Sequence, residues 1–362
     1  RERGMAEEPS VSTPTPRLTR AAGAAVAALV LAGCAVPSGT TTGGPSAGGG
    51  SAAGGRTPTS ATPAYPFTPA ATPTIMPSGA FDKVSTGGPT LAPTAGGPLN
   101  GKVTVADPGH NAGFNPAILN HRGDTPFGPF MCSATGTETA DQSVTEHALN
   151  WQVSQKLAAV LQAKGATVIL TRPDDAGLGP CNIDRARLAN AADADLLISV
   201  HTDGQALGRH GIADPVGFHT QIDSKIGGGK ANKELLQRSL AFAENIVRNM
   251  KAMTDEPVSN YVPRKPEAVW ERPGDLMVLA GLTAAPGALI EMGNLKNPTD
   301  LARLVDPARQ EATAVALEAA IEDTLLKPQY MSPSPEPTTA GPSPSASGAS
   351  SGTASASPSG KG

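Results

Sequence analysis

Two long stretches that are poor in large apolar residues leave only the middle of the chain able to build a hydrophobic core. Residues 34–99 and 328–362 consist mainly of Gly, Ser, Thr, Pro and Ala. Such a composition buries too little apolar surface to offset the entropy lost on ordering, so we expect a disordered linker over 34–99 and a disordered tail over 328–362. Residues 100–327 carry most of the Ile, Leu and Val, and their length suits one globular domain.

The N-terminal segment has the pattern of an export signal. Arg17 and Arg20 precede an apolar run from Ala21 to Leu31 that is too short to span a bilayer and is typical of a signal peptide. The run ends in Leu-Ala-Gly-Cys34, which resembles the lipobox of bacterial lipoproteins. We expect residues 1–33 to be removed and Cys34 to carry a lipid that anchors the exported protein to the cell membrane. A plain signal peptide followed by an unrelated cysteine is the alternative.

The charge balance argues against a nucleic-acid partner. The chain has 28 basic and 32 acidic residues, a formal net charge of -4 and no long run of either sign. Aromatic residues make up only 3% of the chain, which leaves few side chains for stacking on bases. We therefore expect no binding to nucleic acid.

The two remaining cysteines, Cys132 and Cys181, belong to the segment expected to fold. An exported domain meets oxidising conditions, so we predict that these two cysteines form a disulfide. The alternative is a pair of free thiols that lie too far apart to be bridged.

Strand and helix patterns alternate along the middle of the chain. Apolar β-rich runs predict strands, and apolar residues at spacings of three and four predict helices. The strands are expected at 102–106, 166–170, 195–200 and 288–290, and the helices at 143–164, 183–192, 232–253 and 307–326. This alternation predicts a single α/β domain with a mainly parallel, doubly wound sheet flanked by helices.

Four side chains that can perform metal chemistry are expected at one edge of this sheet. His110, His201 and Glu291 each follow a predicted strand, and Glu146 lies in the first turn of the helix after the His110 loop. Ligands collect outside the carboxyl ends of parallel strands. Two His and one Glu suit a catalytic zinc, which keeps a fourth position open for water. Taken singly, each residue also has an ordinary structural explanation.

The sequences around these residues resemble zinc-dependent N-acetylmuramoyl-L-alanine amidases of the amidase_3 type, and most of all their compact mycobacterial branch. The resemblance covers residues 102–326 and follows the family's order along the chain. Its motifs are Val-Ala-Asp-Pro-Gly-His110, Glu146 at a helix start, Ser-Val-His201 preceded by Arg185, and Ala-Leu-Ile-Glu291-Met-Gly-Asn-Leu-Lys-Asn-Pro298.

The resemblance implies a function and a role for each residue. Residues 100–327 would be a zinc amidase domain in which His110, Glu146 and His201 hold Zn²⁺ and Glu291 is the catalytic base. The reaction would be hydrolysis of the peptidoglycan amide bond between N-acetylmuramic acid and L-alanine by a zinc-activated water. We expect a monomer that faces the cell wall and has peptidoglycan as its substrate.

The sequence departs from the family pattern in two places. Asn-Ala follows His110 where glycines are common, and Thr-Asp-Gly204 follows His201. Neither change removes a ligand, but both can alter the lining of the cleft. His219 is the reserve candidate for a ligand, whereas His147 is expected to point away from a metal bound by Glu146 because successive helix positions differ by about 100°. Asp107 is expected to order the loop that carries His110.

Two other functions stay open. The chain could be a lipoprotein that binds peptidoglycan without cutting it, or a zinc peptidase that cuts the stem peptide. Glu291 argues against the first, because a binding protein needs no catalytic carboxylate. The peptides released from a wall digest would separate the second from an amidase.

Overall fold

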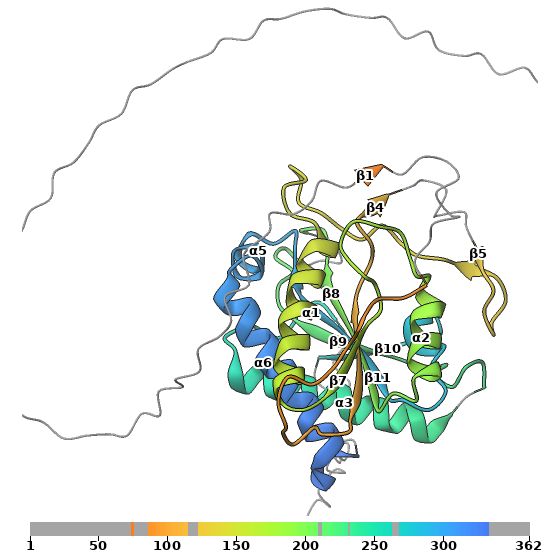
Figure 1. The fold of residues 1–362 in the computed structure, drawn as a ribbon. Helices are drawn as coiled ribbons and strands as arrows, with labels where there is room; N and C mark the ends of the chain where they lie inside the picture. Colours follow the sequence, from red (N-terminus) through yellow and green to blue (C-terminus); the bar gives the residue numbers. More distant parts are fainter. Residues whose placement is uncertain are drawn as a thin grey trace, which may run out of the picture. The chain divides into compact units, whose positions relative to one another are not determined.

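A seven-stranded sheet with helices on both faces forms the centre of the molecule (Figure 1). The computed structural model describes residues 74–75, 86–114, 122–208, 212–230, 232–262 and 268–332, all within one compact unit that spans residues 63–362. The strands are β1 (Thr74–Ile75), β2 (Thr90–Leu91), β3 (Val103–Pro108), β4 (Gly113–Phe114), β5 (Arg122–Gly123), β6 (Phe130–Met131), β7 (Thr167–Leu170), β8 (Leu196–Asp203), β9 (His219–Asp223), β10 (Val269–Arg272) and β11 (Gly287–Asn294).

The main sheet has the strand order β10-β9-β11-β8-β3-β7-β2. Its central strands β11, β8, β3 and β7 run parallel to one another. The direction reverses toward both sides, since β9 pairs antiparallel with β11 and β2 pairs antiparallel with β7. The predicted fold class, a mainly parallel sheet flanked by helices, is therefore confirmed.

The helices are α1 (Glu146–Ala163), α2 (Asn182–Ala191), α3 (Lys233–Met253), α4 (Met277–Ala280), α5 (Pro298–Leu304) and α6 (Pro307–Leu326). Figure 1 shows α1 and α6 on one side of the sheet and α2 on the other. Neighbouring residues of one strand pack into the cores on opposite faces of the sheet, because successive side chains point to alternate faces. On β3, Ala106 joins the larger hydrophobic core with α1, α3 and α6, whereas Val105 joins a second core with α2 and α4.

The four long helices start and end within three residues of their expected positions, and at α3 and α6 a capping side chain marks the start. The side chain of Asn232 caps α3 by accepting a hydrogen bond from the amide of Leu235 at 3.0 Å. Asp306 caps α6 through the amide of Ala308 at 2.9 Å, and Pro307 occupies the first helical position. Asn and Asp at these positions are residue types that favour a helix start, which is why the start of α3 and of α6 could be predicted.

Two strands of the sheet, β9 and β10, were not expected. The sequence predicted no strand between 195–200 and 288–290, because Gly and Pro residues surround the short apolar run near residue 220. In the structure His219–Asp223 is a buried strand, and Val269–Arg272 pairs beside it in parallel. The strands that carry His201 and Glu291 also continue three and four residues beyond their expected ends.

The folded region starts before residue 100, where the sequence placed its boundary. Thr90–Leu91 forms the outer strand on β7, and Leu99 is fully buried. This short strand escaped prediction because its few apolar residues lie among Gly, Pro and Thr. Cys34 and the predicted signal peptide lie outside the described residues. Among the described residues, no helix combines the length and apolar character needed to cross a membrane.

Candidate metal centre

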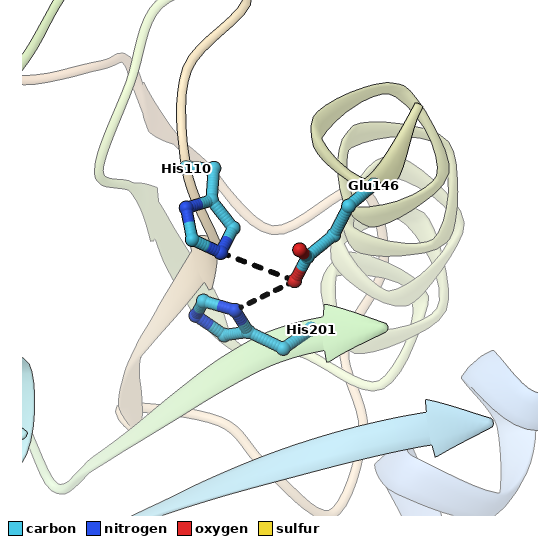
Figure 2. A group of neighbouring side chains, drawn as sticks. All are labelled: His110, Glu146 and His201. Atoms are coloured by element: carbon cyan, nitrogen blue, oxygen red, sulfur yellow. Dashed lines mark hydrogen bonds and ion pairs between the residues drawn. The ribbon is translucent and has the colours of Figure 1, made fainter. Parts of the chain in front are cut away.

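His110, Glu146 and His201 meet at the carboxyl-terminal edge of the parallel strands (Figure 2). His110 follows β3, Glu146 is the first residue of α1, and His201 lies near the end of β8. Oε1 of Glu146 lies 3.2 Å from Nε2 of His110 and 3.0 Å from Nδ1 of His201. One potential ligand atom from each residue lies within 4.8 Å of the others, so the structure brings together the three predicted ligands.

The turn before His110 needs a glycine and an unusual backbone conformation. A Cβ atom on Gly109 would lie 2.3 Å from Nε2 of His201, so any larger residue would displace that imidazole. The amide of Gly109 donates to the carbonyl of Val200 at 2.9 Å, which fixes the turn against β8. His110 itself has a φ of 62°, a left-handed conformation that costs a non-glycine residue free energy. Surrounding contacts must hold it there.

Asp107 and Arg185 supply many of those contacts. Their side chains are both 1% exposed and form an ion pair at 2.8 Å. Arg185 also donates to the carbonyl of Pro108 and, at 2.9 Å, to the carbonyl of His110, while Asp107 accepts from Ser199. Burial opposes the charged form of Asp107, but Arg185 and the hydrogen bonds from Ser199 and Thr171 together outweigh it and lower the pKa of this carboxyl. Asp107 therefore orders the loop, as the sequence predicted.

Backbone atoms of one loop hold the outer sides of two candidate ligands. Nδ1 of His110 lies 3.0 Å from the carbonyl oxygen of Ala134, to which it can donate. Oε2 of Glu146 accepts from the amide of Thr137 at 2.9 Å, and the carbonyl of Thr137 accepts from the amide of Glu146 at 2.9 Å. These contacts leave Nε2 of His110 and Oε1 of Glu146 facing the centre. Sequence reasoning missed them, because any residue type carries backbone atoms.

The electrostatics of the group suit a cation. Burial opposes ionisation of Glu146, but the two imidazoles outweigh it and lower the pKa of this carboxyl. Burial also lowers the pKa of His201, and the neighbouring His110 adds to this effect. For His110 the Glu146 carboxylate overcomes burial and raises the pKa. A largely buried carboxylate beside two imidazoles is a donor set that a divalent ion such as Zn²⁺ fits.

Glu291 faces the same cleft but stands apart from this group. It lies on β11, and the cleft of about 400 Å³ that it lines also includes His110 and Glu146. Gln221 donates to Oε1 of Glu291 at 3.4 Å, and Oε2 has no hydrogen-bond partner within the described part of the chain. Burial raises the pKa of Glu291 well above its usual range, and the carboxylates of Asp203 and Glu146 raise it further.

The other described histidines are not part of the centre. His219 is fully buried on β9, and its Nε2 lies 3.2 Å from Nε2 of Gln221. Burial lowers the pKa of His219 to about 3, with a smaller effect from Arg272. Nδ1 of His147 pairs with Asp175 at 2.8 Å, away from the cleft, as expected. His121 and His210 lie outside the described residues.

The predicted disulfide between Cys132 and Cys181 is present, with a Cα–Cα distance of 4.5 Å. Cys181 is the residue directly before α2, and Cys132 lies two residues before the Ala134 carbonyl that faces His110. The disulfide therefore joins the loop beside the candidate ligands to the start of a helix that packs on the sheet.

A mainly parallel sheet with two His and one Glu at its carboxyl edge, and a separate, half-buried Glu in the same cleft, has the layout of a metal-dependent hydrolase. Residues 105–323 match the Amidase_3 family, N-acetylmuramoyl-L-alanine amidase, and the chain belongs to this family.

Its similarity to mycobacterial members is extensive. The N-acetylmuramoyl-L-alanine amidase Rv3717 of Mycobacterium tuberculosis is 33% identical over 234 residues, which cover 63% of this chain and 89% of Rv3717. Among solved structures, the N-acetylmuramyl-L-alanine amidase Ami1 of Mycobacterium smegmatis matches with a TM-score of 0.55 and 29% identity, over 63% of this chain and 98% of Ami1. Ami1 of Mycobacterium abscessus in its apo form matches with a TM-score of 0.54 and 28% identity, over 61% of this chain and 97% of that structure. The resemblance to the mycobacterial branch is thus confirmed.

Proposed function

We propose that this chain hydrolyses the amide bond between N-acetylmuramic acid and L-alanine in peptidoglycan, using one Zn²⁺ held by His110, Glu146 and His201. Membership of the amidase family supports the reaction. The observation that carries the site is the convergence of these three side chains in a cleft that Glu291 also lines.

Zinc is the metal that the donor set favours. Two imidazole nitrogens and one carboxylate oxygen leave one position of a tetrahedral ion open for water or substrate. The Ala134 carbonyl supports this assignment, because a bond from Nδ1–H of His110 leaves the lone pair of Nε2 for the metal. When bound, Zn²⁺ lowers the pKa of a water and polarises the amide carbonyl.

Glu291 is proposed as the general base and acid. Its carboxylate takes a proton from the water while the water oxygen forms a bond to the carbonyl carbon. The protonated side chain then returns the proton to the L-alanine nitrogen as the carbon–nitrogen bond breaks. A buried carboxyl with a raised pKa suits both steps, because it is basic enough to accept the proton and can donate it afterwards.

The cleft has two walls that the substrate would meet. One wall is Ala134–Thr137 and the other is Thr202–Gln205. The two walls come close together at Gly204 and Thr137. A Cβ atom on Gly204 would lie only 2.3 Å from Oγ1 of Thr137, so this position has no room for a side chain. The departures from the family pattern after His201 thus lie in the cleft wall, where they would affect substrate recognition more than metal binding.

The lipid anchor and export signal are part of the same proposal. A lipid on Cys34 would hold the enzyme at the outer face of the cell membrane, and the Gly- and Pro-rich segment that follows would let the folded domain reach the wall. We propose that the enzyme acts there as a monomer.

Digestion of purified peptidoglycan by the full chain with added Zn²⁺, followed by mass spectrometry, tests the function. An amidase releases intact stem peptides with a free L-alanine amino group and leaves glycan without peptide. A peptidase would give shortened peptides that are still attached to glycan. Binding to the wall without any released product would point to the non-catalytic alternative.

A further inference from the structure

One short loop, Cys132–Thr137, contacts two of the three candidate ligands and is joined to the rest of the protein by the disulfide. We call it the ligand-facing loop. Its Ala134 carbonyl faces Nδ1 of His110 at 3.0 Å, and its Thr137 amide donates to Oε2 of Glu146 at 2.9 Å. Both contacts act on the side of the ligand that points away from the centre, where a partner fixes the orientation of the ligand.

The loop also packs tightly against the same two side chains. Gly136 has a φ of 78°, and a Cβ atom there would lie 3.0 Å from Cγ of His110 and 3.1 Å from Oε2 of Glu146. These distances leave no room for another atom. A side chain at position 136 would therefore press on both candidate ligands.

The attachments of the loop lie at its two ends, because residues 133–137 belong to no helix or strand. At one end Cys132 is bonded to Cys181, and its carbonyl accepts from the amide of Asn182 at 2.7 Å. At the other end the carbonyl of Thr137 accepts from the amide of Glu146 at 2.9 Å, and just beyond it Nζ of Lys296 donates to the carbonyl of Glu138.

The helix that receives the disulfide also holds His110 directly. Arg185, one turn into α2, donates to the carbonyl of His110 at 2.9 Å. The start of α2 thus fixes the main chain of His110 through Arg185, and it fixes the partner of the His110 ring through the disulfide and Ala134. The disulfide is thus the covalent link between α2 and the loop that carries the Ala134 carbonyl.

We propose that the Cys132–Cys181 disulfide is a positioning element of the metal centre and sets its affinity for Zn²⁺. This inference rests on the proposed function, because it assumes that His110, Glu146 and His201 bind the metal. Without the disulfide, the Ala134 carbonyl loses its covalent attachment to the start of α2, and the His110 ring loses the fixed partner that orients it. Loss of such outer contacts lowers metal affinity by about 10- to 100-fold.

The test compares the full chain with its C132S/C181S variant, both as metal-free protein. The dissociation constant for Zn²⁺ is measured by competition with a chelator, well below the unfolding temperature of both proteins. We expect the constant to rise by about 10- to 100-fold in the variant. The visible spectrum of the Co²⁺-loaded centre should change as well, since it reports the geometry of the ligands.

A matched control separates positioning from general stability. Ile321 is fully buried in the core on α6, close to Glu318, which pairs with Lys164 at the end of α1 opposite Glu146. Ile321→Ala should lower the unfolding temperature but leave the Zn²⁺ dissociation constant within about twofold, because it is remote from the loop.

Each outcome decides a different question. A folded C132S/C181S protein with unchanged Zn²⁺ affinity overturns the inference, since the disulfide would then only stabilise the fold. If the unsubstituted chain binds no Zn²⁺, the proposed function fails instead. If the variant is partly unfolded in buffer, the same comparison is made in concentrated sucrose, which favours the compact state.

Discussion

Glu291 on β11 is paired in register with His201 on the neighbouring parallel strand β8. Paired residues on adjacent strands point to the same face of a sheet, so this register places the candidate catalytic carboxylate beside a candidate ligand. The relative position of the two residues depends on backbone hydrogen bonds in the centre of the sheet and not on a flexible loop.

Glu291→Gln should separate catalysis from metal binding. Glutamine keeps the size of the side chain but cannot accept a proton from water, so we expect amide cleavage to fall by about two to four orders of magnitude with near-full zinc content. His110→Ala and His201→Ala should lose zinc and activity together, and Glu146→Gln should bind zinc more weakly. Elemental analysis beside muropeptide release measures both properties. A Glu291→Gln protein that stays fully active or loses its zinc would contradict the assigned role.

Gly109→Ala should damage the centre without any change to a ligand. The new Cβ atom would lie 2.3 Å from the His201 imidazole, so the ring must move. We expect weaker zinc binding and reduced activity in a protein that still folds, as checked by circular dichroism. Gly177→Ala is the matched control, because its nearest neighbour would lie 3.8 Å away. Equal zinc affinity in the two variants would be evidence against the close contact.

Removal of Arg185 should destabilise the fold much more than removal of an exposed arginine on the same helix. Arg185→Met leaves the buried Asp107 carboxylate without its cation, which we expect to lower the free energy of unfolding by about 3–5 kcal/mol. Arg187 forms an ion pair with Asp184 in which the side chains are 51% and 41% exposed. Arg187→Met should therefore change the free energy of unfolding by less than about 1 kcal/mol. Urea unfolding measures both, and similar values would refute the argument.

His219 should make stability depend on pH. Burial lowers its pKa to about 3 in the folded protein, whereas its value in an unfolded chain is about 6.5. Between these values the unfolded chain binds a proton that the folded protein does not. Stability is therefore full above pH 6.5 and falls as the pH decreases toward 3, by up to about 1.4 kcal/mol per pH unit.

His219→Phe removes the group that binds this proton. It keeps an aromatic ring beside Tyr261, whose ring packs edge to face with His219 at a centroid distance of 5.7 Å. The free energy of unfolding of the metal-free protein, measured with urea, should decrease less between pH 7 and pH 5 in the variant than in the unsubstituted chain. The same loss in both proteins would mean that His219 does not control this dependence.

Cys34→Ala tests the anchor. Without the thiol no lipid can be attached, so the variant should leave the membrane fraction or keep its signal peptide. Cell fractionation and intact mass measure both effects. If the variant still sediments with membranes as a processed protein that differs only by the substituted atom, the lipoprotein interpretation is wrong.

Periodic patterns in the sequence predicted the framework of this fold. The central strands β7, β8 and β11 contain nearly continuous apolar runs, as buried parallel strands require, and β3 was predicted from an alternating β-rich pattern. The metal-binding side chains could also be predicted, because His and Glu at strand ends and helix starts are distinctive residue types in distinctive places. Both signals come from side chains that differ from their neighbours.

The missed features have no such signal. Ile222 is the single apolar residue of the strand His219–Asp223, and its four polar residues are buried all the same, so its sequence looked like a solvated connection. The carbonyl of Ala134 and the amide of Thr137 orient two candidate ligands, yet neither side chain takes part in the contact. Their role depends on where the chain passes in space, which periodicity does not encode.

The reversed direction of β9 has a consequence for how this fold can diversify. Because β9 runs antiparallel to β11, it begins at the edge of the sheet where β8 ends, with His219 beside Glu291. The connection over residues 204–218 therefore leaves and re-enters the sheet at the same edge, with β11 between its two strands. Insertions or deletions in this connection can remodel the mouth of the cleft without altering strand order or the ligand set. It is the natural place for evolution, or for an engineer, to change which wall fragments are accepted.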